Sequence, residues 1–269
     1  MKTFNLLIAT SIACLALSAC GAKEAIESIR PPSGKNGYRV ITTPDLSSAN
    51  TSNVKLKING KTYQSGEKID IATLHQNTVY NQSYEMTADK MENGRKVNFK
   101  EEGTARIYKN KYSVVLAAHV EKEIQNNIST NVDKSKVLAV QGQATKRDKL
   151  PTHGSFLYVG QAFTGKNNTG TLTYNVDFDR SKGSGTISGL RGYNNISLEE
   201  ASIQRFNPDG TFGGKAGIEG RASYGQFSGS YKLGFFGPKA EEIAGQAGLK
   251  IGDKDVNIGF GGRKQPGSK

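Results

Sequence analysis

Apolar and polar residues alternate along most of the chain after residue 53. The clearest case covers residues 171–179, in which every second residue is apolar: Leu172, Tyr174, Val176 and Phe178. Side chains two positions apart lie on the same face of a β-strand. The pattern therefore predicts a strand with one face in a core and the other in water.

Turn signals separate these alternating segments. Residues 54–58 alternate apolar residues with lysines, and Asn59-Gly60 follows them. Asn-Gly between two such runs is typical of a two-residue β-hairpin turn, and Asn93-Gly94 repeats the signal. Strands at this spacing predict an antiparallel all-β sandwich or barrel. In the second half of the chain, a short helical piece is expected only from Lys239 to Ile243, ended by Gly245.

The N-terminus has the pattern of an export signal. An apolar run over residues 4–17 is too short to span a bilayer, and small residues lead from it to Cys20. We predict a signal peptide over residues 1–19, acylation of the Cys20 thiol, and a flexible tether over residues 20–52. Gly21, by its similarity to other lipoproteins, favours the outer membrane over the inner one.

Composition excludes several classes of protein and several kinds of site. The mean hydropathy of −0.53 excludes a polytopic membrane protein, and 32 glycines in 269 residues agree with many tight turns. Cys14 lies in the signal and Cys20 carries lipid, so disulfide, zinc–thiolate and cysteine-nucleophile chemistry are not expected. Acidic residues are mixed among the basic ones that give the net charge of +12. We expect this charge to serve solubility or attraction to anionic host surfaces, and we expect no nucleic-acid partner.

Candidate catalytic and ligand-binding residues are sparse. The three histidines are His75, His119 and His153, and none has a metal-ligand spacing. Asp177 and Asp179 share the polar face of the strand over residues 171–179, where a solvated outer face is the simpler interpretation. Neither a phosphate-binding loop nor a serine nucleophile motif is present. We therefore predict no enzyme, no metal and no cofactor.

The second half of the chain resembles the factor H binding protein family of surface lipoproteins, within the transferrin-binding-protein-like β-barrels. Four stretches carry the resemblance: Gly160–Phe163, Gly170–Phe178, Gly229–Tyr231 and Gly234–Gly245. The last is the most specific, because a Phe-Phe pair is followed by a Gly-Pro turn and then by Lys-Ala-Glu-Glu-Ile-Ala-Gly. A fainter resemblance extends through the first half.

The resemblance implies a fold and a location. It implies an open antiparallel N-terminal β domain over residues 53–149 and an eight-stranded antiparallel β-barrel over residues 150–266. It also implies export by an outer-membrane translocator to the cell surface, where Cys20 would hold a monomer by its lipid. The expected partner is a host serum protein such as complement factor H or a related regulator, bound for immune evasion.

The partner-binding residues follow from the same resemblance. Two positions of the family that contact factor H align with Phe227 and Gly248, and we add Tyr224 and Lys250 beside them. The alternative function is nutrient acquisition, in which the chain would hold haem or an iron carrier such as haemoglobin or transferrin. If the ligand is haem, one of the three histidines would ligate it. A third alternative is a structural surface lipoprotein without a specific ligand.

Overall fold

The computed structural model describes residues 37–206 and 215–267, which are almost entirely β-structure. The predicted signal peptide and Cys20 lie outside the described residues. The N-terminal unit is an open, antiparallel, six-stranded sheet in the order β3-β2-β5-β6-β7-β8. Its strands are β2 (Thr51–Ile58), β3 (Lys61–Tyr63), β5 (Thr78–Glu92), β6 (Arg95–Lys109), β7 (Ser113–Gln125) and β8 (Ile128–Gly142).

The predicted hairpin turns are confirmed. Asn59 and Gly60 connect β2 to β3 with φ of 49° and 78°, and Asn93 and Gly94 connect β5 to β6 with φ of 49° and 74°. Positive φ at both central residues matches the right-handed twist of paired strands, and Asn and Gly adopt it at low cost. The local sequence therefore fixes the register of these hairpins.

A closed antiparallel barrel follows the sheet. Its eight strands, in the closed order β10-β11-β12-β13-β14-β15-β16-β9, confirm the predicted architecture. They are β9 (Ser155–Thr164), β10 (Asn168–Asp177), β11 (Lys182–Ser188), β12 (Ile196–Arg205), β13 (Ala216–Tyr224), β14 (Phe227–Phe236), β15 (Glu242–Ile251) and β16 (Lys254–Lys264). A 3-10 helix, η1 (Arg147–Lys149), lies in the connector between sheet and barrel.

The barrel core explains part of the glycine content. The predicted inward residues of β10 are fully buried, and the Tyr174 and Tyr231 hydroxyls lie 2.9 Å apart inside the barrel. A Cβ at Gly183 would lie 2.8 Å from the Tyr174 ring, and one at Gly220 would lie 2.6 Å from the Tyr231 ring. These two glycines leave room for bulky tyrosines that a larger residue would displace.

The predicted helical piece from Lys239 to Ile243 is wrong. Residues 237–240 form a turn in which Ala240 has a φ of 56°, and β15 begins at Glu242. The Ala240 carbonyl accepts a hydrogen bond of 2.7 Å from the Tyr158 hydroxyl, and the Ala240 side chain is buried. Burial against the barrel core therefore overrides the helix propensity of this segment.

The predicted tether over residues 20–52 differs from the structure where the structure describes it. Strand β1 (Val40–Thr42) pairs with β4 (Lys68–Asp70), and Tyr38 and Ile41 are buried. The polar composition of this segment gave no sign that Ile41 would pair with Ile69, 28 residues further along the chain, or that the Tyr38 N–H would bond to the Asn110 carbonyl. Long-range pairing of this kind leaves no local pattern.

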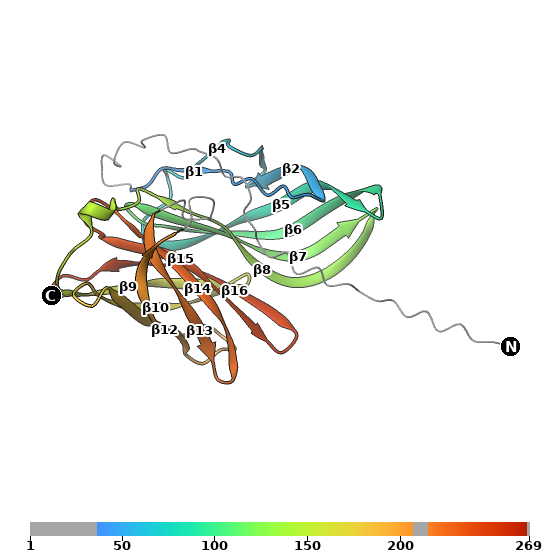
Figure 1. Ribbon diagram of the computed structural model, residues 1–269. Coiled ribbons are helices and arrows are strands. Elements are labelled where there is room, and N and C mark those ends of the chain that lie inside the picture. The colour runs from blue at the N-terminus through green and yellow to red at the C-terminus, as the bar shows by residue number, and fades with distance from the viewer. Residues whose placement is uncertain (1–36, 207–214, 268–269) are drawn as a thin grey trace.

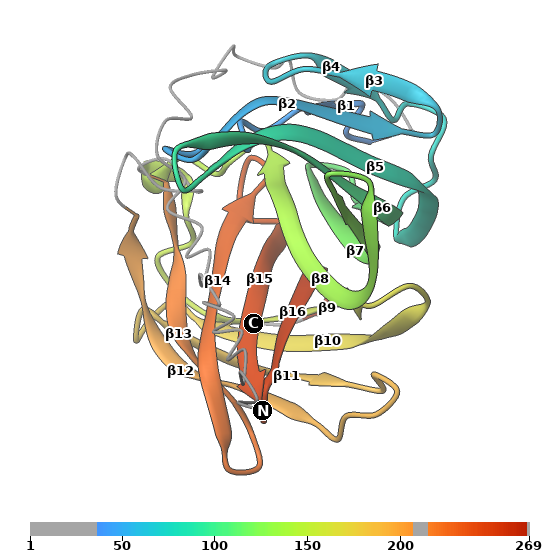
Figure 2. The same ribbon diagram turned by 90° about the vertical axis from the view of Figure 1, so that its right-hand side faces the viewer.

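Three layers result (Figure 1). The β1–β4 ladder covers one face of the sheet, and the barrel covers part of the other face, as Figure 2 also shows. The sheet–barrel contact is apolar in its centre, with buried residues from both units: Tyr108, Val115, Ala117, Val137, Val140, Phe163, Phe206, Phe236 and Ala244. Within the described residues, no helix has the length and apolarity needed to cross a bilayer.

Candidate partner-binding surface

Three aromatic rings gather at one end of the barrel. This end, called the mouth below, carries the turns that follow β9, β11, β13 and β15. Tyr193 meets Tyr224 edge to face with ring centres 5.9 Å apart, and Tyr224 stacks on Phe227 at 6.4 Å. All three are only partly buried. Half-exposed aromatic side chains are the residues that most often anchor a protein partner.

The four predicted binding residues divide between two adjoining surfaces. Tyr224 and Phe227 face each other across the β13–β14 hairpin at the mouth. Gly248 and Lys250 lie on β15, where their neighbour Leu249 is buried in the barrel core. Because strand side chains alternate, Gly248 and Lys250 face outward from the barrel wall.

The Gly248 position has little spare room. Its strand partner is Ser230 on β14, and a Cβ at Gly248 would lie 3.3 Å from Asn257 Oδ1. A longer side chain there would require the Asn257 amide to shift. No side chain projects from the outer wall at Gly248, which allows close approach of a partner's backbone.

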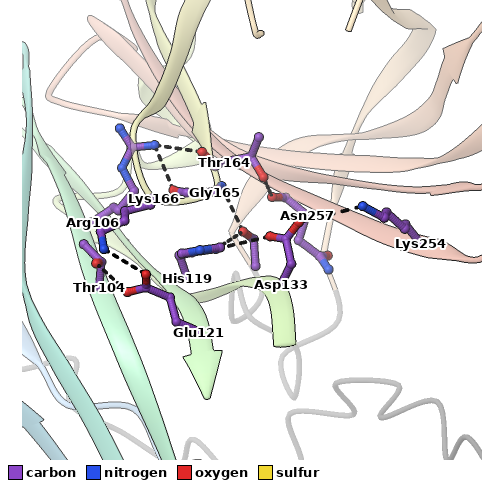
Figure 3. Close-up of polar contacts among 11 residues, drawn as sticks. Thr104, Arg106, His119, Glu121, Asp133, Thr164, Gly165, Lys166, Lys254 and Asn257 are labelled. Atoms are coloured by element: carbon purple, nitrogen blue, oxygen red, sulfur yellow. Dashed lines mark hydrogen bonds and ion pairs between the residues drawn. The ribbon is translucent and has the colours of Figure 1, made fainter. Parts of the chain in front are cut away.

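A cluster of charged side chains joins the mouth to the sheet (Figure 3). Lys166, in the β9–β10 turn, donates a hydrogen bond of 2.8 Å to Glu121 on β7, which lowers the pKa of that carboxyl. Lys254, at the start of β16, lies 3.8 Å from Asp133 on β8. We call these four residues the corner. They contribute a mixed, exposed charge pattern beside the aromatic rings.

His119 lies at the same corner but in a buried position. Its Nδ1 is 3.5 Å from Ser135 Oγ and 3.8 Å from Asp133 Oδ1, and its side chain is 10% exposed. Ser135 Oγ also accepts a hydrogen bond of 2.9 Å from the Gly165 N–H. Both oxygens approach the same histidine nitrogen, so the arrangement does not relay a proton from serine to aspartate. It serves as a contact between sheet and barrel.

The other two histidines lie elsewhere. His153 Nδ1 is 3.0 Å from Asp179 Oδ1 on an exposed loop, and His75 is exposed beside β5. Among the described residues, no group of three or more His, Cys, Asp or Glu side chains could hold a metal ion. The structure thus brings no two histidines together and adds no support for haem ligation.

Arg106 fixes the barrel against the sheet beside the corner. It is 3% exposed, and its Nη1 donates to the Thr164, Gly165 and Asn168 carbonyls at 2.9, 3.2 and 2.7 Å. Nη2 donates to Thr169 Oγ1 at 2.7 Å. Burial lowers the pKa of the guanidinium to about 10. Sequence reasoning missed this residue, because a single arginine in a strand carries no signal of its distant partners.

Glu242 makes the corresponding link at the other end of the barrel. Its carboxylate accepts hydrogen bonds from the Lys111 N–H, the Tyr112 N–H and the Ser113 hydroxyl at 2.9, 3.0 and 2.8 Å. Burial raises the pKa of Glu242 to about 7, although these three donors act to lower it. Together, Arg106 and Glu242 hold the mouth in a defined orientation relative to the sheet.

A hollow of about 500 Å³ continues the corner onto the sheet. Its charged lining comes from β2, β5, β6 and β7 and consists of Lys57, Glu85, Glu102, Glu121 and Lys122. Glu121 belongs both to this hollow and to the corner. The candidate surface therefore extends from the aromatic mouth across the corner to a polar recess.

Residues 148–247 match the family model described as Factor H binding protein, C-terminal. The match covers 100 of the 269 residues, which is less than half of the chain. The match covers most of the barrel, including Tyr224 and Phe227, and ends one residue before Gly248. The rest of the chain lies outside it.

Solved structures give weaker likenesses. Intact Ap-TbpB, with N and C lobes, is 18% identical over 80% of this chain and 46% of its own, with a TM-score of 0.46. Transferrin binding protein B from Haemophilus parasuis is 19% identical over 80% of this chain and 45% of its own, with a TM-score of 0.44. Transferrin binding protein B from serogroup B Neisseria meningitidis is 14% identical over 80% of this chain and 44% of its own, with a TM-score of 0.40. This chain thus spans less than half the length of these proteins.

Proposed function

We propose that this chain is a lipid-anchored bacterial surface protein that binds a host protein, with complement factor H or a related regulator as the partner. The observation that carries the proposal is the family match over residues 148–247, because the family is named for factor H binding. The predicted signal and Cys20 would place the protein on the outer membrane. Its role would be immune evasion, and it would act as a binder and not as an enzyme.

The aromatic mouth and the corner are the proposed contact surface. Tyr193, Tyr224 and Phe227 offer apolar area, and Lys166 and Lys254 offer charge at its rim. Interfaces commonly combine an aromatic centre with a polar rim. The ties made by Arg106 and Glu242 keep this surface preorganised, which reduces the entropy lost on binding.

The chain departs from the family at two positions. By the resemblance, Phe227 and Gly248 stand where the family has glutamates that contact factor H, so the partner would meet an aromatic ring and a bare backbone. A charge pair at an interface can contribute several kcal/mol, on the order of 2–5. We therefore expect the host species and the exact regulator to differ from those of family members that keep both acids.

Surface plasmon resonance tests the proposal directly. The full chain is immobilised through its N-terminus, and factor H from several hosts is passed over it. Binding that saturates supports the proposal. Absence of binding from every host at micromolar concentrations overturns it. A pull-down from host serum, read by mass spectrometry, then shows whether an iron carrier is retained instead.

A further inference from the structure

Positive charge gathers at the barrel end opposite the mouth. Strands β14 and β16 run away from the mouth, and their far ends lead to the turn at residues 237–241 and to Lys264. We call six cationic residues from the segments that meet around residues 237–242 the basic end: Lys111, Lys146, Arg147, Lys239, Arg263 and Lys264. Five are exposed and Lys264 is partly buried. Lys149, in the connector that carries Lys146 and Arg147, pairs with Asp148 at 3.4 Å.

Hydrogen bonds bring these residues together from four segments of the chain. The hairpin that carries Lys111 is bonded to Glu242, and the N–H of Lys264 donates to the Glu241 carbonyl at 2.8 Å. The connector that leads to Lys146 is bonded to the same turn, because Thr145 Oγ1 donates to the Gly237 carbonyl at 2.7 Å. All four segments therefore meet around residues 237–242.

The cations of the basic end make no ion pairs among the described residues, although Asp148, Glu241 and Glu242 lie in the same segments. Among the described residues, none of the six cations lies within 4.0 Å of a carboxylate oxygen. Asp148 pairs with Lys149 at 3.4 Å, Glu241 Oε2 accepts the Lys239 N–H at 2.8 Å, and the charge of Arg263 acts on the buried Glu242. The remaining excess of cations over acids on one surface creates a positive potential that attracts anionic groups.

The chain enters the described fold at this same end. The N–H of Tyr38 donates to the Asn110 carbonyl at 3.2 Å, and Asn110 directly precedes Lys111. Cys20 lies 17 positions before Gly37. Even fully extended, that length of chain spans at most about 60 Å. A lipid on Cys20 would therefore attach the fold to the bilayer from the side of the basic end.

We propose that the basic end docks onto the anionic phosphate headgroups of the membrane that holds Cys20, and so turns the mouth outward. This inference rests on the lipid anchor in the proposed function. Clustered Lys and Arg side chains bind anionic bilayers with roughly additive strength. Docking at one end would present Tyr224 and Phe227 to a soluble partner, whereas a freely tumbling molecule would present them only part of the time.

Fluorescence energy transfer on the full acylated chain tests the docking. A donor dye on Asp253→Cys, in the exposed β15–β16 turn at the mouth, is paired with an acceptor on lipid headgroups. Vesicles are made of neutral phosphatidylcholine, with or without anionic phosphatidylglycerol. Docking moves the mouth away from the bilayer, so transfer falls on anionic vesicles and recovers at high salt, where charges are screened.

A charge-reversed variant measures how much the cations of the basic end contribute to docking. Lys146→Glu, Arg147→Glu and Lys239→Glu together should lower the ratio of docked to undocked molecules at least about 100-fold, at roughly fivefold for each cation lost. The matched control reverses three exposed lysines of the sheet, Lys55, Lys61 and Lys96, and should keep the wild-type transfer.

Two results would overturn the inference. Equal energy transfer on both vesicle compositions would show that the basic end does not dock. An equal loss of docking in the charge-reversed variant and its control would show the same. Neither result would contradict the lipid anchor. Failure of the chain to associate stably with either vesicle removes the anchor and the docking together. The two failures are therefore distinguishable.

Discussion

The guanidinium of Arg106 lies 5.3 Å from the centre of the Phe163 ring, so that a sheet residue covers an aromatic residue of the barrel. The same guanidinium donates hydrogen bonds to three carbonyls in the β9–β10 hairpin. Within the described residues it has no carboxylate within ion-pair distance. Its charge is instead held by carbonyl dipoles and a π face, which is the environment that a planar, weakly hydrated cation tolerates best.

Arg106→Ala should destabilise the fold by about 3 kcal/mol, because several buried carbonyls lose their donor at once. Arg106→Lys should recover only part of this loss, since one ammonium cannot reach acceptors on two sides. Urea denaturation measures both changes. The exposed Lys166→Gln provides the control and should change the free energy of unfolding by less than about 1 kcal/mol. Equal effects of Arg106→Ala and Lys166→Gln would contradict the structural role of Arg106.

Local pattern predicted those parts of the fold that local physics determines. The alternation over residues 171–179 predicted β10, and Asn59-Gly60 predicted the β2–β3 hairpin, because both depend on neighbours in sequence. Ala240 and Tyr38 were mispredicted because their conformations depend on Tyr158 and on the Asn110 carbonyl, which lie far along the chain.

The candidate surface was only partly predictable for the same reason. Phe227 was predicted from the resemblance to the family and Tyr224 was added beside it, and the structure brings the two into contact across a hairpin. Tyr193 is separated from Tyr224 by all of β12 and β13, so its place at the mouth depends on the closed barrel. No pattern in the sequence marks it.

Glu242 should make stability depend on pH. Its pKa of about 7 in the fold exceeds the ordinary value of 4.5, so the folded state binds the proton more tightly than the unfolded state. Protonated Glu242 therefore stabilises the fold by on the order of 3 kcal/mol. This stabilisation is fully present below about pH 4.5 and is lost as the pH rises through 7. Glu242→Gln cannot ionise and should remove this dependence.

The measurement for Glu242 is the free energy of unfolding of both proteins between pH 4 and 8. As the pH rises, the free energy of unfolding of the variant should increase relative to that of the wild type. Loss of hydrogen bonds to Lys111 and Ser113 can lower the stability of Glu242→Gln at every pH, so the slope and not the level carries the result. A constant difference across the range would refute the pKa shift.

Gly183→Ala should destabilise the barrel by about 1–3 kcal/mol, because overpacking forces neighbours off their preferred positions. The added Cβ would lie 2.8 Å from both Ile218 Cδ1 and the Tyr174 ring. Gly248→Ala is the matched control on the same barrel, where the nearest atom, Asn257 Oδ1, lies 3.3 Å away. Thermal unfolding of the two variants should show a clear loss for the first and a small change for the second.

Cys20→Ala should abolish incorporation of labelled palmitate and release the protein from the membrane fraction. The reason is that acyl chains contribute about 0.8 kcal/mol for each buried CH₂ group, and no other predicted feature supplies a comparable anchor. Cys14→Ala, in the predicted signal, should leave labelling unchanged. Palmitate incorporation that survives Cys20→Ala would place the anchor elsewhere.

Tyr224→Ala and Phe227→Ala should each weaken binding of the host partner at least about tenfold, because truncating a central aromatic residue of an interface typically costs 1–2 kcal/mol or more. Both rings are partly buried at the mouth and pack on each other, so each variant is first checked by its melting temperature. Thr173→Ala, exposed on the outer wall of β10, is the control and should bind as wild type does. Surface plasmon resonance against the retained serum partner measures all three affinities. If both aromatic variants stay folded and bind with unchanged affinity, the partner contacts another face of the molecule.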